Sequence, residues 1–172
     1  MSELDSGLEA ALLPPVKLPP YQPHHRAKHE LLRRYMDVRT SKLGFSYNQV
    51  ALVDGFSSAG RYGDKQRGSP LIMLDAYVGR TDADRAHFKA PPHFIFIESK
   101  KSFARHLKAE VEAYPTLHGA VVDIIHGTYE DESPAVIKYL SRAYRQPVPR
   151  FVFVDPAATP TTRSRTSRIT SA

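Results

Sequence analysis

The sequence contains no cysteine and no long hydrophobic run. Without cysteine the chain has no disulfide and no thiolate metal site, which fits the reducing cytoplasm. No apolar stretch approaches the ~18 residues that a membrane span needs. The first ten residues, MSELDSGLEA, are acidic and lack the basic start and apolar centre of a secretory signal. We therefore expect a cytoplasmic protein that does not bind a membrane.

Several catalytic signatures are also missing. The chain has neither a G-x-S-x-G nucleophile motif nor a phosphate-binding P-loop, which sets aside the common hydrolases and NTPases. Three of its histidines, His24, His25 and His29, lie close together but show no metal-ligand spacing with a carboxylate partner. The sequence therefore predicts no metal site.

The composition is that of one ordinary globular domain. The chain has 172 residues, 41% of them hydrophobic and 24% charged, which is enough to form a core. The formal net charge is +6, which permits a polyanionic partner without requiring one.

The two ends of the chain differ from its centre. Residues 1–25 contain five prolines and predict a disordered Pro-rich arm, which is more typical of a linker than of a recognition peptide. Residues 157–172 are rich in Ser, Thr and Arg without apolar periodicity, so we expect a disordered tail. The domain is expected over residues 26–156.

Within that domain, helical and strand patterns alternate. The spacing predicts helices over about 26–41, 68–79, 101–114 and 134–144, strands over about 49–54, 94–98, 121–125 and 151–154, and a polar loop over 80–92. This alternation is typical of an α/β fold with a parallel sheet and right-handed crossovers. The pattern stops after the fourth strand, which would leave one edge of the sheet uncovered.

Local signals refine the helices. In the first, Leu31, Leu32, Tyr35 and Val38 are expected to form the apolar side, with Gly44 and Asn48 ending the helix. In the second, Ser69 is expected as N-cap, followed by Pro70 at the first helical position. In the last, the inward residues are expected to be Val136, Ile137, Leu140 and Ala143.

The polar positions of the first helix are mostly basic. Such a row is either a solvated helix face or a phosphate-binding surface for nucleic acid. The nucleic-acid interpretation assigns contacts to Arg26, Lys28, Arg33 and Arg34.

Each predicted strand ends in a small or polar motif. Asp54 precedes a loop of small residues, and the later strands end at Glu98, at His126-Gly127 and at Asp155-Pro156. The carboxyl ends of parallel strands meet at one edge, where open α/β sheets bind nucleotide-like ligands. These motifs suit a cofactor with an amino-acid head, a ribose and an adenine, with Asp155 placed where a transferred group would meet its acceptor.

Six segments, taken in order along the chain, resemble the three-Cys-motif partner (TcmP) family. They are Lys28-His29, VDGFSSAGRY (53–62), GSPLI (68–72), FIFIES (94–99), HG (126–127) and FVFVDP (151–156). They are also similar to bacterial enzymes that methylate an adenine N6 in large-subunit ribosomal RNA. The resemblance covers roughly residues 26–156, and D-G-F-x-x-x-G-R-Y and G-S-P-L-I are its most specific pieces. It implies a Rossmann-like, S-adenosylmethionine-dependent methyltransferase architecture, with nucleic acid or a three-Cys-motif protein as partner.

The resemblance also implies roles for individual residues. Asp155 and Pro156 would occupy the catalytic strand end, where the adenine enzymes accept hydrogen bonds from the amino group of a flipped-out base. The cofactor would contact His29 beside it, Asp54, Phe56 and Gly60 in the loop, Ser69 at its helix start, Glu98 at the ribose, and His126 with Gly127 at the adenine.

Some positions depart from the family pattern. Ala157 and Ala158 replace a second proline and an aromatic residue, His126 stands where the RNA enzymes carry an acid, and Ser58 stands where glycine is usual. The family's fold also continues beyond this chain, so we expect a sheet that is incomplete in its C-terminal half. Three interpretations follow: a cofactor-binding methyltransferase-like domain acting on or near nucleic acid, a catalytically inactive partner or nucleic-acid-binding protein, and a degenerate fragment.

Overall fold

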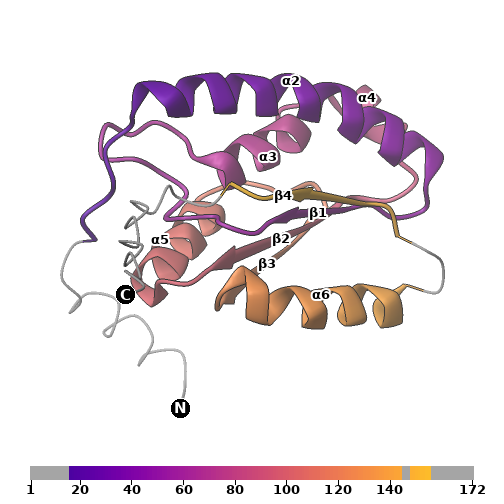
Figure 1. The fold of residues 1–172 in the computed structure, drawn as a ribbon. Coiled ribbons are helices and arrows are strands. Elements are labelled where there is room, and N and C mark those ends of the chain that lie inside the picture. Colours follow the sequence, from indigo (N-terminus) through magenta and orange to yellow (C-terminus); the bar gives the residue numbers. More distant parts are fainter. Residues whose placement is uncertain (1–15, 145–147, 156–172) are drawn as a thin grey trace, which may run out of the picture.

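Four parallel strands form the centre of the molecule (Figure 1). The computed structural model describes residues 16–144 and 148–155. The strands lie in the order β3-β2-β1-β4. They are β1 (Ala51–Asp54), β2 (His93–Glu98), β3 (Val121–His126) and β4 (Arg150–Phe153). This confirms the predicted parallel α/β sheet with Rossmann-like topology.

The two central strands are the most apolar. Every residue of β1 and β2 is buried, because helices cover both faces of the sheet. The strands at the two edges, β3 and β4, are only partly buried. The strand registers place Asp54 beside Phe96 on one side and Phe153 on the other. This aligns the carboxyl ends of the central strands.

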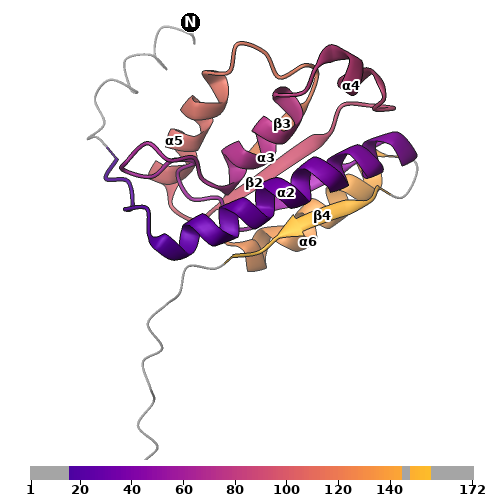
Figure 2. The same ribbon diagram turned by 90° about the horizontal axis from the view of Figure 1, so that it is seen from above.

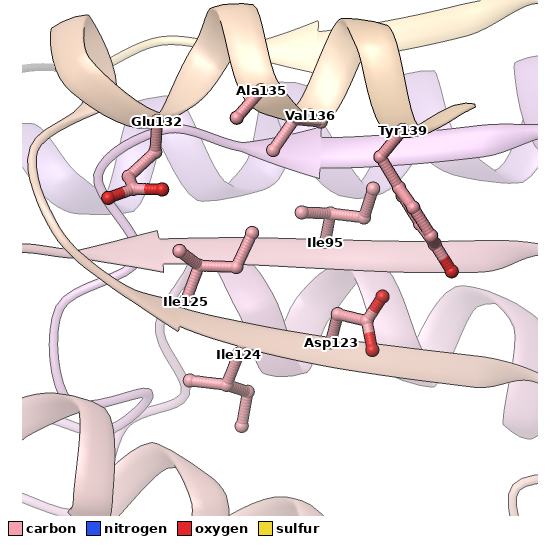
Figure 3. A pocket seen from close by; sticks show the side chains of 8 residues that line it. All are labelled: Ile95, Asp123, Ile124, Ile125, Glu132, Ala135, Val136 and Tyr139. Atoms are coloured by element: carbon pink, nitrogen blue, oxygen red, sulfur yellow. The ribbon is translucent and has the colours of Figure 1, made fainter. Parts of the chain in front are cut away.

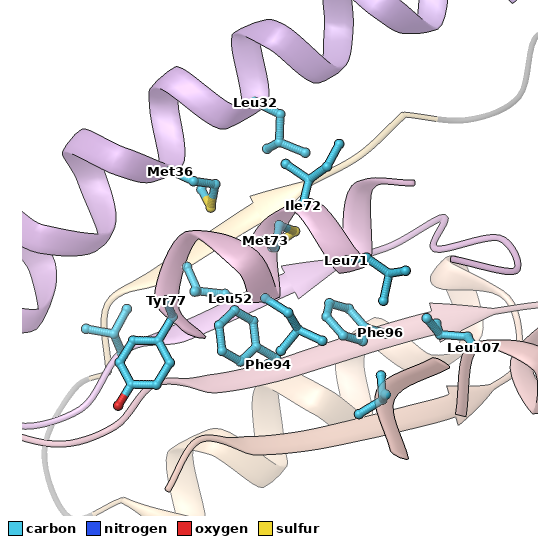
Figure 4. Close-up of a cluster of buried hydrophobic side chains, with 13 residues drawn as sticks. Leu32, Met36, Leu52, Leu71, Ile72, Met73, Tyr77, Phe94, Phe96 and Leu107 are labelled. Carbon is cyan, nitrogen blue, oxygen red and sulfur yellow. The ribbon is translucent and has the colours of Figure 1, made fainter. Parts of the chain in front are cut away.

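Helices form one layer on each face of the sheet (Figure 1). α2 (Pro23–Ser46), α3 (Ser69–Val78) and α5 (Lys101–Glu112) pack on one face, where α2 runs alongside β4 (Figure 2). The core on that face joins residues of α2, α3, β2 and α5 (Figure 4): Leu32, Met36, Ile72, Met73, Phe94, Phe96 and Leu107. α6 (Tyr129–Ala143) covers the other face.

The first helix is longer than predicted and buries a different side. It begins at Pro23 and ends at Ser46, and Leu31 and Val38 are exposed. The buried side is partly polar and small: His29, Leu32, Met36, Thr40 and Gly44. Glycine at position 44 leaves room for the ring of Phe88 against the helix, because an added Cβ would overlap Phe88 Cδ1. The apolar pattern missed this side because it gave no weight to His, Thr and Gly.

Other helix boundaries also differ. The N-cap of α3 is Gly68, so Ser69 is its first residue rather than its cap. Part of the expected 80–92 loop is a short helix, α4 (Asp82–Ala86), capped by the Thr81 side chain, which accepts a hydrogen bond from the Asp84 amide.

The last helix begins earlier than predicted. Thr128 caps α6 by accepting a hydrogen bond from the Asp131 amide, and three acidic residues in the first turn favour a helix N-terminus. Pro134 therefore lies inside the helix rather than at its start. Only Val136 and Leu140 of the four expected inward residues are buried, because Ile137 and Ala143 face solvent.

The expectation of disorder over residues 1–25 is wrong for residues 16–25. The Pro19 carbonyl accepts a hydrogen bond from the Gly63 amide (2.9 Å), and the ring of Tyr21 packs edge-on against Tyr62 with centroids 5.0 Å apart. These contacts attach the segment to the loop after β1. Residues 1–15 and the tail expected over 157–172 lie outside the described residues. Within the described ranges, no helix is both long and apolar enough to cross a bilayer.

Candidate functional site

The structure brings the strand-end residues to one edge of the sheet. Asp54 ends β1, Glu98 ends β2 opposite His126 of β3, and Asp155 follows β4. The predicted residues Asp54, Glu98, His126 and Asp155 are therefore neighbours along this edge, as expected for parallel strands. Pro156, the second predicted catalytic residue, lies outside the described part of the chain.

Asp54 is a fully buried carboxylate with one unpaired oxygen. Its Oδ1 accepts a hydrogen bond from the Phe56 amide (3.1 Å), whereas Oδ2 has no hydrogen-bond partner among the described residues. Burial raises the pKa of Asp54 to about 7, with a smaller rise from the nearby Asp155 and Glu98 carboxylates. The Ser69 hydroxyl, which lies next to this carboxylate without making a hydrogen bond of normal geometry to Oδ2, and the Phe56 amide lower the pKa and so oppose this rise. Asp54 is thus able to change its charge near neutral pH.

His29 is the second buried polar group with an unpaired atom. It lies on the buried side of α2, and its Nδ1 has no partner within the described part of the chain. Burial lowers the pKa of His29 to about 4, and the neighbouring His25 and Arg33 lower it further, while Asp155 raises it. The imidazole is therefore neutral at pH 7.

Three rings surround His29. Tyr21, His25, His29 and Tyr62 form an aromatic cluster whose neighbouring centroids are 4.9 to 6.2 Å apart. Burial raises the pKa of Tyr62 to about 12, followed by contributions from Tyr21 and Asp155. Lys28, which lies between His25 and His29 in α2, pairs with Asp155, whose carboxylate raises the pKa values of His25, His29 and Tyr62.

Sequence reasoning missed most of this cluster. Tyr62 ends the D-G-F-x-x-x-G-R-Y segment, which offered a signal that was not used for this residue. Tyr21 lies in the arm that we expected to be disordered. His25 appeared only in a histidine-rich stretch that was considered for metal binding.

Lys28 and Asp155, which the sequence interpretation placed in two different roles, form an ion pair. Lys28 was assigned to nucleic acid and Asp155 to catalysis, but Lys28 Nζ lies 2.5 Å from Asp155 Oδ1. The pair connects α2 to the end of β4 beside the aromatic cluster. An acceptor amino group that binds Asp155 would have to displace the Lys28 ammonium or share the carboxylate with it.

Packing and backbone conformation favour small residues in the loop after β1. Gly60 has φ +78°, and an added Cβ would lie 2.7 Å from Leu107 Cδ1. A Cβ on Gly55 would lie 2.5 Å from Tyr129 Cδ2, and Tyr129 also packs near Phe56 with centroids 5.9 Å apart. Ser58 adopts φ 55°, a left-handed conformation that favours glycine. The ring of Tyr129 therefore lies against the backbone of Gly55 on one side of this loop.

Glu98 and the β3 end form the other part of the edge. Glu98 is buried, and its Oε1 accepts a hydrogen bond from the Lys100 amide (2.7 Å). His126 Nε2 lies 3.0 Å from the Ser99 carbonyl oxygen, and the Gly127 amide donates to the Glu98 carbonyl (3.0 Å). Ser69, at the start of α3, is buried on the Asp54 side.

The structure does not place the four predicted nucleic-acid residues on one face. At 3.6 residues per turn, Lys28 points about 160° away from Arg26 around the helix axis. Arg33 and Arg34 both lie near Glu30, at 3.9 and 2.9 Å, which partly neutralises them. The basic character of α2 is therefore distributed around the helix.

A separate pocket of about 420 Å³ lies between α6 and strands β2 and β3 (Figure 3). None of the predicted site residues lines it. Next to it is a polar network that sequence reasoning also missed. The buried His93 lies between Asp123 (Nε2 to Oδ2, 2.8 Å) and Tyr144 (Nδ1 to the hydroxyl, 3.0 Å). This network joins β2, β3 and the end of α6, and all three of its side chains are paired.

No family model and no curated protein sequence matches this chain. Among the described residues, no group of three or more histidine and acidic side chains is arranged to hold a metal ion.

Proposed function

We propose that the chain is a methyltransferase-like domain that binds S-adenosylmethionine at the carboxyl edge of its sheet and acts on or near nucleic acid. The observation that carries this proposal is the pair of unpaired buried atoms, Asp54 Oδ2 and His29 Nδ1. An unsatisfied buried polar group costs about 1–3 kcal/mol. A polar ligand that pairs with these atoms would recover that cost.

The residues along the edge suit the parts of this cofactor. Asp54 offers an acceptor to the ammonium of the amino-acid head, and the positive charge would favour the ionised carboxylate. Glu98, at the end of the next strand, suits the ribose hydroxyls, and His126 with Gly127 suits the adenine. When bound, the cofactor would supply an activated methyl group.

On the acceptor side, Asp155 is the residue that would hold an amino group. Its partner Lys28 is next to His29 of the aromatic cluster in α2, and the rings of this cluster would supply the aromatic surface that Ala157 and Ala158 lack. Lys28 would have to release the carboxylate first. Nucleic acid as the acceptor class is supported by the family resemblance and by the aromatic surroundings of Asp155.

Calorimetric titration of the full chain with S-adenosylhomocysteine tests the cofactor site. We expect saturable binding that weakens at least about tenfold in Asp54→Asn and in Glu98→Gln, since each removes a charged acceptor. Glu112→Gln, which changes an exposed carboxylate at the end of α5, is the matched control and should bind like the wild type.

The same experiment separates the other interpretations. No binding by a protein that melts cooperatively would overturn the cofactor proposal and favour an inactive partner that keeps the fold. The Lys28–Asp155 pair supports that second candidate, because it occupies the carboxylate that catalysis would need. A broad, non-cooperative melt would instead favour the degenerate fragment.

A further inference from the structure

The outer edge of β4 has free main-chain groups. On its inner side, β4 pairs with β1: the Ala51 amide donates to Pro149 (3.1 Å) and the Gly55 amide to Phe153 (2.9 Å). Alternate residues of a strand in a parallel sheet face opposite neighbours. The N–H and C=O groups of Arg150, Val152 and Val154 therefore face outward, and no strand within the described ranges pairs with them.

This edge lacks the usual protection. Natural edge strands carry charged residues, prolines or bulges that discourage pairing with another chain. Here four apolar residues, Phe151 to Val154, separate Arg150 from Asp155. Val152 is 41% exposed and Val154 48%, and both lie on the sheet face opposite α2. An added strand would find apolar surface on that face.

The other face of the same edge is basic. α2 runs antiparallel to β4, because Lys28 contacts Asp155 and the ring of Tyr35 packs on Phe151 with centroids 4.8 Å apart (Figure 2). The exposed Arg39 and Lys42 share this flank of the helix, since they and Lys28 fall within about 60° of one another around its axis. Arg39 also lies over the Tyr35 ring, 5.4 Å from its centroid.

We propose that β4 binds an extended segment of a partner protein that adds to the sheet as a further strand. Alternation of side chains would place its apolar residues beside Val152 and Val154 and its acidic residues beside the basic flank of α2. A second copy of this chain fits less well, because a two-fold pairing through β4 would bring the two basic flanks together. The inference does not depend on the cofactor proposal.

Two synthetic peptides test the inference with the ¹⁵N-labelled full chain. We expect acetyl-EVEVEVE-amide to shift the amide signals of Arg150, Val152 and Val154. We expect acetyl-KVKVKVK-amide to bind at least about tenfold more weakly, because it has the same alternation and the opposite charge.

Matched substitutions on the two edges locate the contact. Val152→Lys should weaken binding of the acidic peptide about tenfold, whereas Val121→Lys on β3, whose valine is similarly exposed at 48%, should leave it within about twofold. If Val152→Lys does not fold, Val154→Lys replaces it, and the comparison of the two peptides needs no variant.

Several outcomes would overturn the inference. These are equal binding of the two peptides, shifts confined to β3, or no shift at a large excess of peptide. A concentration-dependent dimer of the wild type in sedimentation velocity, lost in Val152→Lys, would assign the edge to a second copy instead.

Discussion

Lys28 and Asp155 form an ion pair although 127 positions separate them in the chain. The pair attaches the first described helix to the end of the last described strand. It also places an ammonium on the carboxylate that the proposed chemistry would use, so it affects both stability and function.

A double-mutant cycle on Lys28→Ala and Asp155→Ala measures the coupling. The two side chains are 45% and 32% exposed, so solvent screens the attraction. We expect a coupling free energy of about 0.5–1 kcal/mol from urea unfolding. The exposed pair Glu30 and Arg34 within α2 is the control, with about 0.3–0.5 kcal/mol expected. A coupling energy near zero would contradict a stabilising Lys28–Asp155 ion pair.

Asp54 should make the protein less stable as the pH rises. Its folded pKa of about 7 lies above the ordinary value of 3.8, so the folded state binds the extra proton. The stabilisation is complete below about pH 4 and is lost as the pH rises through about 7. The free energy of unfolding should fall by up to a few kcal/mol across this interval. In Asp54→Asn this decline should disappear, as measured by urea unfolding at several pH values. An unchanged slope would show that Asp54 ionises normally.

His29 should act in the opposite direction. Its folded pKa of about 4 lies below the ordinary 6.5, so the unfolded state binds more protons in between. Stability therefore rises with pH between about 4 and 6.5 and is complete above that range. His29→Gln should remove this rise and leave the Asp54 decline visible alone. If the variant and the wild type have parallel profiles, His29 is not buried as described.

Gly60 should not tolerate a side chain. In Gly60→Ala the left-handed φ of +78° and the contact with Leu107 should lower the unfolding free energy by about 1–3 kcal/mol. Gly63→Ala is the matched control in the same loop, because its Cβ would meet nothing closer than 3.6 Å and its φ is not left-handed. Equal urea midpoints for the two variants would contradict the loop geometry.

Strand positions were predictable because buried parallel strands appear as short β-branched and aromatic runs. Phe94 to Ile97 and Val50 to Val53 have this pattern, and the structure places both runs in the centre of the sheet. The polar residue that follows each apolar run indicated which side chains would lie together at the carboxyl edge of the sheet. No pattern of this kind specifies which atoms remain unpaired there.

The errors come from tertiary contacts. The buried side of α2 includes His29, Thr40 and Gly44 because α3 and Phe88 pack against it, and hydrophobicity alone selected Leu31 and Val38 instead. The pairing of Lys28 with Asp155 and the aromatic cluster around Tyr21 join segments that are distant in the chain. Local sequence spacing contains no information on such contacts.

The packing of α2 on β4 has a consequence for synthesis of the chain. α2 is translated early, but its Tyr35 and Lys28 find Phe151 and Asp155 only after the last described strand has emerged from the ribosome. β1 likewise cannot pair along its second edge until β4 has been synthesised. Such long-range closure slows folding and leaves an exposed helix face and strand edge in the nascent chain. The face of α2 that packs on β4 and the β4-facing edge of β1 therefore stay uncovered until the last described strand is available.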